Sequence, residues 1–221
     1  MSYKGKGADR EKLDLVIGDL NLLFSQEEIS FDKIDEVLKT LSSEEAKSYL
    51  KSLRSGAKPE TALRESFFAG NTVLARHLFL EKSPEVNVGV GFIDYVIEES
   101  GRLVRLELKP FFEAVQLESG DRIIKQVKLR PEDHKDQILK YFQRDKYVIL
   151  TNLKEWYFFN DQVRPANFRP FSAASFSEFL VDYERTQSLW DLLERREYAS
   201  VGEDLDKQFF GSLKGWVNKL S

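Results

Sequence analysis

The chain has 221 residues, of which 42% are hydrophobic and 32% charged, and its formal net charge is −4. This composition is typical of a globular protein and excludes an intrinsically disordered chain. The absence of cysteine excludes disulfides and thiolate metal sites, and the negative charge limits any DNA contact to a local basic patch. No apolar run approaches the roughly 18 residues of a membrane span, so the sequence predicts no membrane contact and a cytoplasmic location.

Three regions are predicted along the chain. Residues 1–58 form an N-terminal helical region, because apolar residues recur there at helical spacing. Residues 59–165 form the core, and a stretch containing glycine and proline marks its beginning. Residues 166–221 form a C-terminal helical region or connector. Because the last apolar helical pattern continues to the end of the sequence, we expect the chain to be a piece of a longer protein.

The core region combines helices and strands. A helix is predicted from residue 59 to about residue 80, followed by a β-hairpin and a mixed segment. A second predicted helix, 131–142, leads into the apolar strand 146–151 and its partner strand 156–159. This order of elements predicts an α/β fold.

The predicted hairpin carries two acids and a lysine. With the Ser-Gly pair 100–101 as its two-residue turn, the register places Asp94 directly opposite Glu107. Opposed residues share a face, with Cβ atoms roughly 4.5–5.5 Å apart. Lys109 lies two residues beyond Glu107 and therefore projects from the same face.

This group of side chains has the chemistry of a metal site. Mg²⁺ prefers oxygen ligands, so Asp94 and Glu107 would hold it, with the backbone carbonyl of Leu108 as a third ligand. A bound metal polarises a phosphoryl oxygen and lowers the pKa of a bound water. Lys109 would orient that water or offset the charge that develops in the transition state. Without a cation, the two close carboxylates would repel each other.

Two sequence segments resemble the signature of the PD-(D/E)XK nuclease superfamily: 91–94 (Gly-Phe-Ile-Asp) and 106–110 (Leu-Glu-Leu-Lys-Pro), with Ile93 where the pattern often has proline. The resemblance implies a restriction-endonuclease-like central mixed sheet flanked by helices. It also implies acids that bind Mg²⁺, or Mn²⁺ in its place, and a lysine that assists phosphodiester hydrolysis. The tripeptide alone is weak evidence, since Glu-Ala-Lys at 45–47 also matches it on a predicted helix.

Elements on both sides of the hairpin add to the resemblance. Glu65 lies on the preceding predicted helix, much as an acid of a core helix does in these nucleases, and this implies an assisting role at the metal or water. Gln137 and Tyr141 are similar to the Gln-x-x-x-Tyr element of several restriction enzymes and share one helix face. The strand and Thr-Asn pair at 148–152, followed by Trp156, are also similar to a segment of those domains.

The combination most resembles the N-terminal endonuclease domain of type IIG enzymes, which fuse restriction and modification, and it covers about residues 60 to 160. It implies double-stranded DNA as the substrate. Because the sequence has neither a Gly-rich cofactor loop nor an Asn-Pro-Pro-Tyr element, the methyltransferase and target-recognition domains of such a fusion would be missing. One catalytic set cuts one strand, so cleavage of both strands implies a transient dimer or two events.

Other residues have a functional and a structural interpretation. Lys125, Lys128 and Arg130 either contact DNA phosphates or form a solvated basic stretch. Tyr141 either contacts DNA or packs half-buried. For Asp94, Glu107 and Lys109, the structural alternative is a solvated strand face bearing an ion pair. For Glu65 and Gln137 it is an acid and an amide on the surface of a helix.

The whole chain also has two alternative interpretations. The first is a catalytically silent nuclease-like fold that serves as a DNA-binding or protein-interaction module. The second is a helical adaptor in which the hairpin is incidental.

Overall fold

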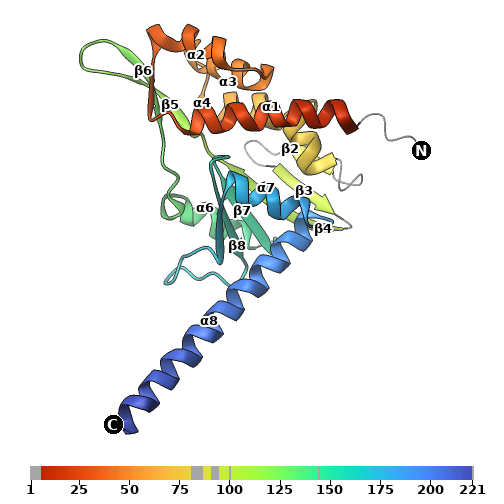
Figure 1. Ribbon diagram of the computed structural model, residues 1–221, viewed down its shortest axis with the longest axis vertical. Helices are drawn as coiled ribbons and strands as arrows, with labels where there is room; N and C mark the ends of the chain where they lie inside the picture. The colour runs from red at the N-terminus through yellow and green to blue at the C-terminus, as the bar shows by residue number, and fades with distance from the viewer. Residues whose placement is uncertain (1–5, 81–86, 91–94, 100, 144, 221) are drawn as a thin grey trace.

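A six-stranded sheet forms the centre of the computed structural model, which describes residues 6–80, 87–90, 95–99, 101–143 and 145–220 (Figure 1). Its strand order is β2-β3-β4-β7-β8-β9, in which β4 and β7 run parallel and all other neighbours run antiparallel. The strands are β2 (Asn87–Val90), β3 (Tyr95–Glu99), β4 (Arg102–Leu108), β7 (Tyr147–Thr151), β8 (Glu155–Asn160) and β9 (Ser172–Ser175). The predicted α/β class with a central mixed sheet is therefore confirmed at this coarse level.

The predicted hairpin register is confirmed as far as the structure describes it. Glu99 pairs with Arg102, and the ladder continues to the pair Tyr95 and Leu106. Gly101 has a φ of 76°, in the left-handed region that glycine adopts without steric cost. The hairpin thus forms for the reason that its sequence predicted, a tight turn between two strands.

A second, three-stranded antiparallel sheet lies beside helices α2 and α3 at one end of the molecule (Figure 1). Its order is β1-β6-β5, with β1 (Glu28–Ser30), β5 (Phe112–Gln116) and β6 (Arg122–Gln126). The sequence predicted only a mixed segment for β5 and β6, and β1 lies within the region 1–58 that was predicted to be helical. Phe112 is the one buried residue of β5, so this strand lacks the apolar alternation that identifies a strand in sequence.

Helices precede and follow the central sheet, but β9, one of its strands, lies within the region 166–221 that was predicted to be helical. The N-terminal elements are α1 (Lys6–Phe24), η1 (Phe31–Lys33), α2 (Ile34–Thr40) and α3 (Glu44–Arg54). Before the hairpin come α4 (Pro59–Leu63), η2 (Arg64–Phe68), α5 (Val73–Ala75) and η3 (Arg76–Leu80). Later in the chain come η4 (Pro131–His134), α6 (Lys135–Tyr141), α7 (Phe176–Glu184) and α8 (Leu189–Leu220).

The prediction of one continuous helix from residue 59 to about residue 80 is wrong. The helix stops after Phe68, where Ala69 takes an extended conformation, and α5 begins after Thr72. Thr72 Oγ1 lies 2.8 Å from the carbonyl oxygens of Phe67 and Ala69, and it accepts from the N–H of Ala75 at 3.4 Å. The Gly-Asn-Thr sequence at 70–72 favours such a turn and cap over a continuous helix.

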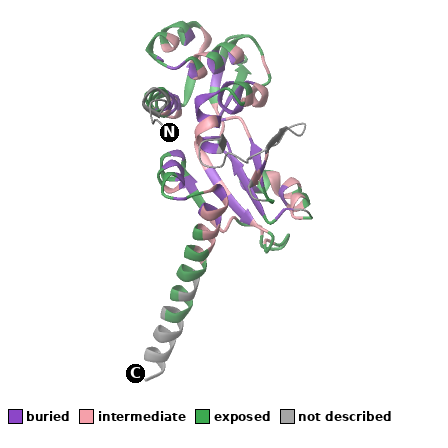
Figure 2. Ribbon diagram, turned by 90° about the vertical axis from the view of Figure 1, so that its right-hand side faces the viewer, coloured by how far each residue is buried: buried purple, intermediate pink, exposed green. Residues whose placement is uncertain are grey.

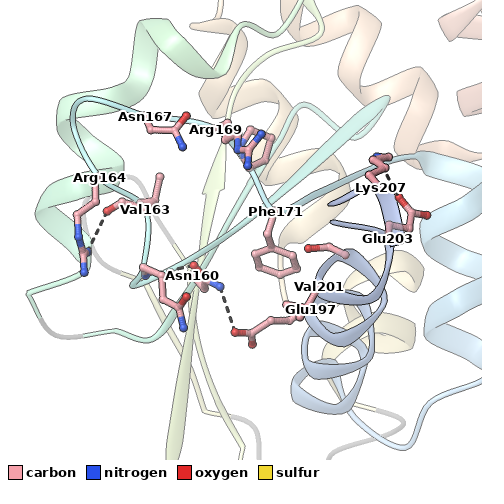
Figure 3. A pocket seen from close by; sticks show the side chains of 13 residues that line it. Asn160, Val163, Arg164, Asn167, Arg169, Phe171, Glu197, Val201, Glu203 and Lys207 are labelled. Carbon is pink, nitrogen blue, oxygen red and sulfur yellow. Dashed lines mark hydrogen bonds and ion pairs between the residues drawn. The ribbon is translucent and has the colours of Figure 1, made fainter. Parts of the chain in front are cut away.

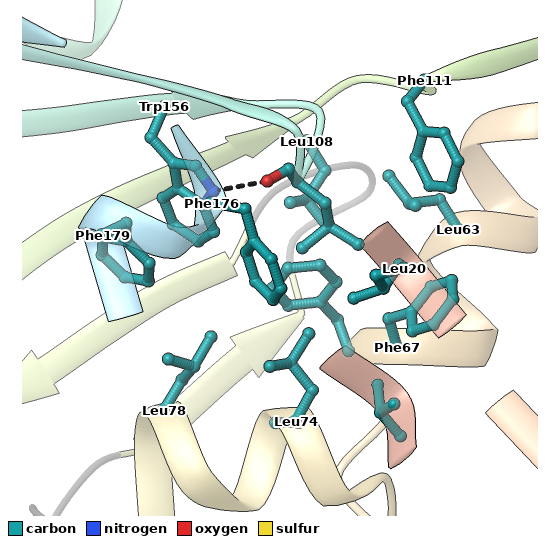
Figure 4. Close-up of a cluster of buried hydrophobic side chains, with 14 of the residues drawn as sticks. Leu20, Leu63, Phe67, Leu74, Leu78, Leu108, Phe111, Trp156, Phe176 and Phe179 are labelled. Carbon is teal, nitrogen blue, oxygen red and sulfur yellow. Dashed lines mark hydrogen bonds between the residues drawn. The ribbon is translucent and has the colours of Figure 1, made fainter. Parts of the chain in front are cut away.

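One face of the central sheet packs into the main hydrophobic core. Leu108 and Trp156 of the sheet meet Leu20 of α1, Phe67 of η2 and Phe176 of α7 in one cluster (Figure 4). Burial of such a side chain contributes roughly 1.5–3 kcal/mol to stability. The N-terminal helices and α7 therefore share one core with the sheet.

The opposite face of the sheet carries a smaller apolar cluster beneath α6. Ile138 of α6 packs there with Val148 and Leu150 of β7 and with Phe159 of β8. Strand β7 is buried along its whole length, as expected for a central strand covered on both faces. This smaller cluster fixes α6 over the face of β4 that bears the charged residues.

Polar contacts join the small sheet to the rest of the molecule. The side-chain amide of Gln126 donates to the carbonyl oxygens of Phe24 and Gln26, both at 3.1 Å. Lys154, in the turn between β7 and β8, donates to Gln126 Oε1 at 2.6 Å and to the Phe24 carbonyl at 3.1 Å. The small sheet is thereby anchored to α1 and to the central sheet at the same place.

Helix α8 begins in the core and then extends away from it (Figure 2). Leu189, Leu192 and Leu193 are buried, whereas Tyr198 and Val201 are exposed. Within the described part of the chain, no helix combines the length and the apolar composition needed to cross a membrane.

Candidate active site

Glu107, the penultimate residue of β4, is a buried acid with 0% exposure. Its Oε1 accepts a hydrogen bond from Gln137 Nε2 at 2.7 Å and lies 2.6 Å from Lys109 Nζ. Its Oε2 accepts from the Tyr141 hydroxyl at 2.8 Å. A buried carboxylate is costly unless it is paired and hydrogen-bonded, and these three donors meet that requirement.

Helix α6 supplies two of the three donors. Gln137 and Tyr141 are four residues apart and share one helix face, and Gln137 Nε2 also donates to the Tyr141 hydroxyl at 2.8 Å. Ile138 holds the helix on the sheet through the apolar cluster beneath it. The structure therefore brings four predicted site residues together: Glu107, Lys109, Gln137 and Tyr141.

Lys109 is positioned by the parallel pairing of β4 with β7. Its backbone N–H donates to the Thr151 carbonyl at 2.8 Å, directly beyond the last strand pair. Two hydrogen bonds close the turn between β7 and β8. Thr151 Oγ1 donates to the Glu155 carbonyl, and Asn152 Oδ1 accepts from the Glu155 N–H. The Thr-Asn pair of the sequence pattern thus shapes the turn beside Lys109.

Glu60 is a further acid near this site that sequence reasoning missed. Its Oε1 lies 3.7 Å from Lys109 Nζ, and this buried oxygen makes no hydrogen bond within the described part of the chain. Helical periodicity could have identified it, because Glu60, Leu63 and Phe67 fall at i, i+3 and i+7, and the two apolar residues are buried. Glu60 therefore lies on the inward stripe of its helix.

Glu65, the acid that sequence reasoning selected on the same segment, is exposed. It lies close to the phenol of Tyr95, at the start of β3. Burial raises the pKa of Tyr95 to about 12, and the Glu65 carboxylate adds to this rise, while Arg64 opposes it. Among the contacts of the described residues, none joins Glu65 to Glu107 or to Lys109. The interaction that the structure gives for Glu65 is thus with Tyr95 of β3.

The oxygen atoms around Lys109 are of the kind that bind a hard divalent cation. Glu107, Glu60 and the carbonyl at the end of β4, from Leu108, are the ligand types that Mg²⁺ and Mn²⁺ take. Asp94, the other predicted ligand, lies outside the described residues. Across the described ranges, no three acidic or histidine side chains are grouped closely enough to hold a metal. In the described part of the site, the positive charge between the carboxylates of Glu60 and Glu107 is the ammonium group of Lys109.

His134 is a second residue near Lys109 that sequence reasoning did not select. It lies one helical turn before Gln137 and is half-buried. Burial lowers the pKa of His134, and the positive charge of Lys109 lowers it further, while Asp133 acts in the opposite direction. Burial and the charge of Lys109 therefore hold the pKa of the imidazole below its ordinary value.

Replacing His134 by glutamine is expected to reduce the acid sensitivity of the fold. Because the pKa of His134 is lower in the folded chain, the unfolded chain binds the proton more readily, and stability falls as the pH drops below the unfolded value of about 6.5. Glutamine cannot take up this proton. Urea unfolding at several pH values should show the wild type losing stability relative to His134→Gln below that value. A difference that stays constant with pH would contradict this.

The predicted DNA-contacting cations lie together in a separate hollow. Lys125, Lys128 and Arg130 line a cavity of about 300 Å³ that also contains Glu113 and Asp133. Lys125 pairs in register with Glu113 of β5 on one side and with Glu28 of β1 on the other. Lys128 and Arg130 lie on the exposed segment that leads from β6 into η4. The segment that carries Lys128 and Arg130 therefore leads directly into η4 and α6, and α6 carries Gln137 and Tyr141 of the site.

A larger hollow, of about 410 Å³, lies between the 160–171 loop and α8 (Figure 3). Glu197 accepts there from Asn160 Nδ2 at 3.1 Å and from the Tyr147 hydroxyl. Arg164 at its rim donates to the carbonyls of Asp161 and Val163. None of the predicted site residues lines this hollow. Its polar groups Asn160, Arg164 and Glu197 form hydrogen bonds within the protein.

In comparisons with protein-family models, with curated proteins and with solved structures, the chain matches none.

Proposed function

We propose that the chain is a Mg²⁺-dependent DNA endonuclease domain with a restriction-endonuclease-like fold. The observation that carries this proposal is the buried Glu107 carboxylate, bound by Lys109, Gln137 and Tyr141 at the end of β4. A hairpin strand next to a parallel strand, with a helix over the site, supports the same assignment. The buried position of Glu107 argues against the solvated ion pair that was the structural alternative.

The residues of the site have separate roles in this proposal. Asp94 and Glu107, with the carbonyl of Leu108, hold the metal, for which Mn²⁺ substitutes. When bound, the metal supplies a polarised phosphoryl oxygen and a bound water of lowered pKa. Lys109 orients the attacking water and offsets negative charge on the phosphate. Gln137 and the hydroxyl of Tyr141 fix the carboxylate of Glu107, as outer-shell groups do for metal ligands.

We propose double-stranded DNA as the substrate, with Lys125, Lys128 and Arg130 contacting its phosphates. A single catalytic set cuts one strand, so cutting both requires a transient dimer or two successive events. Methylation and sequence recognition would belong to methyltransferase and target-recognition domains outside this chain. A cleavage rate that rises more than linearly with protein concentration would support the dimer.

Metal-dependent nicking of supercoiled plasmid DNA tests the proposal. We expect nicked circles in Mg²⁺ or Mn²⁺ and none in EDTA, with the product lost in Lys109→Met and retained in Lys140→Met. Lys140 is a matched control because it is an exposed lysine on α6. If the chain retards DNA in a gel but never nicks it in either metal, it is the catalytically silent module. If it neither binds nor cuts DNA, the adaptor interpretation holds.

Glu60 and Glu65 are predicted to differ in their effect on the cleavage rate. We expect Glu60→Gln to lower the cleavage rate by roughly 10–100-fold, the effect typical of groups just outside a metal's ligands. Glu65→Gln should leave the rate near the wild-type value, because its carboxylate is exposed and none of the described contacts joins it to Glu107 or Lys109. Rates measured under single-turnover conditions would decide between them. The reverse order of effects would assign the assisting role to Glu65, as the sequence resemblance implied.

A further inference from the structure

Three charged residues alternate along the chain beneath α6: Arg105 and Glu107 of β4, and Lys109 directly after its end. Arg105 has no place in the proposed chemistry, yet its side chain is only 19% exposed. Its Nε donates to Asp145 Oδ2 at 2.9 Å. The Asp145 side chain is 1% exposed, so this is a desolvated ion pair and not a surface one.

The Arg105 guanidinium also lies against the ring of Tyr141, with 4.6 Å between Cζ and the ring centroid. This is within the range of an attractive cation–π contact. Asp145 is tied to the same tyrosine, because its backbone N–H donates to the Tyr141 carbonyl at 3.0 Å. Arg105 and Asp145 thus hold Tyr141 through its ring and through its backbone, and the Tyr141 hydroxyl donates to Glu107.

We propose that Arg105 and Asp145 are positioning residues of the nuclease site: they hold the Tyr141 ring so that its hydroxyl fixes Glu107 Oε2. This inference rests on the proposed function for its catalytic meaning. With Oε2 fixed by Tyr141, the carboxylate presents Oε1 to Lys109 in one orientation. Arg105 touches none of the reacting atoms and acts only through the tyrosine.

The energetic cost of burying the Asp145 carboxylate supports this assignment. Asp145 Oδ1 is buried and has no hydrogen-bond partner within the described part of the chain, an expensive state for a carboxylate oxygen. Arginine is suited to this place because its planar head can pair with a carboxylate and lie flat on a ring at the same time. Lysine keeps the positive charge but lacks a planar head group. Arg105→Lys should therefore free the Tyr141 ring without leaving Asp145 unpaired.

A double-mutant cycle with Tyr141→Phe tests whether Arg105 acts through the tyrosine. We expect Arg105→Lys and Tyr141→Phe each to lower kcat for cleavage by roughly 10–100-fold, as loss of an outer-shell partner does. KM for DNA should not change, and the double variant should be no slower than Tyr141→Phe alone. Effects that multiply, or a change confined to KM, would overturn the proposal and make Arg105 an independent or DNA-contacting residue.

A second measurement separates this inference from the proposed function, because it needs no cleavage. With tyrosine labelled by ¹³C at Cζ, the Tyr141 resonance is identified by its disappearance in Tyr141→Phe. Arg105→Lys should shift and broaden this resonance and leave the other tyrosine signals in place. If Arg105→Lys does not fold, Asp145→Asn, which keeps the shape of the side chain, should produce a smaller change in the same resonance. An unchanged Tyr141 signal in a folded variant would overturn the proposal, whether or not the wild type cuts DNA.

Discussion

Glu107→Gln is expected to slow metal-dependent cleavage by at least about 10²–10³-fold, the loss typical of removing one charge-stabilising group from an active site. Glutamine keeps the volume of the side chain but removes the negative charge that would hold the metal. It also places an amide donor among groups that all donate to this position, namely Lys109, Gln137 and Tyr141. Single-turnover cleavage of a labelled duplex measures the effect.

The matched control for this change is Glu36→Gln, because Glu36 is an exposed acid on α2 and lines neither of the two hollows. It should cleave at the wild-type rate. Near-ultraviolet circular dichroism of both variants shows whether the fold is retained. A folded Glu107→Gln variant that cleaves as fast as the wild type would remove Glu107 from the proposed mechanism.

Lys109→Met is expected to affect stability as well as cleavage. Lys109 Nζ lies 2.6 Å from an acid with 0% exposure, and the lysine side chain is itself only 16% exposed. Removing one partner of a buried pair leaves an uncompensated charge and typically costs about 3–5 kcal/mol. Methionine preserves the apolar stem, so the loss reports the charge and not the packing. Denaturant unfolding without metal measures it, with the exposed Lys140→Met as control.

Divalent cations should restore the stability of Lys109→Met without restoring its cleavage. A cation that binds only the folded chain stabilises it by mass action, and beside Glu107 it would replace the missing positive charge. We therefore expect Mg²⁺ or Mn²⁺ to raise the Tm of Lys109→Met more than that of the wild type. An equal rise in both proteins would indicate that the metal does not replace the charge of Lys109, and no rise in either would indicate that it does not bind beside Glu107.

Local signals in the sequence predicted much of this architecture. A Ser-Gly pair between two apolar strands was enough to predict the hairpin register, and Gly101 has the positive φ that such a turn needs. The four-residue spacing of Gln137 and Tyr141 predicted a shared helix face, which the structure turns toward Glu107. In these cases the deciding interactions are local, or are fixed by strand alternation.

The features that sequence reasoning missed depend on long-range packing. Asp145 follows α6 in a short loop, and only the packing of that helix on β4 brings it to Arg105, 40 positions away. Glu60 lies on the inward stripe of its helix, but only the packing of that helix brings its Oε1 to 3.7 Å from Lys109 Nζ. Strand β5 has too few buried residues to produce an apolar pattern. Composition and periodicity do not show which of these elements pack against each other.

In the proposed mechanism, Glu107 binds the metal that cleavage requires. Crystals of the chain soaked in Mn²⁺ test it most directly, because the anomalous signal of manganese locates the ion without reference to activity. We predict an anomalous peak within ligand distance of the Glu107 carboxylate, about 2.0–2.2 Å for a hard divalent cation, with Asp94 as a second ligand. The absence of a peak at Glu107, at a Mn²⁺ concentration at which the wild type cuts DNA, would contradict the account.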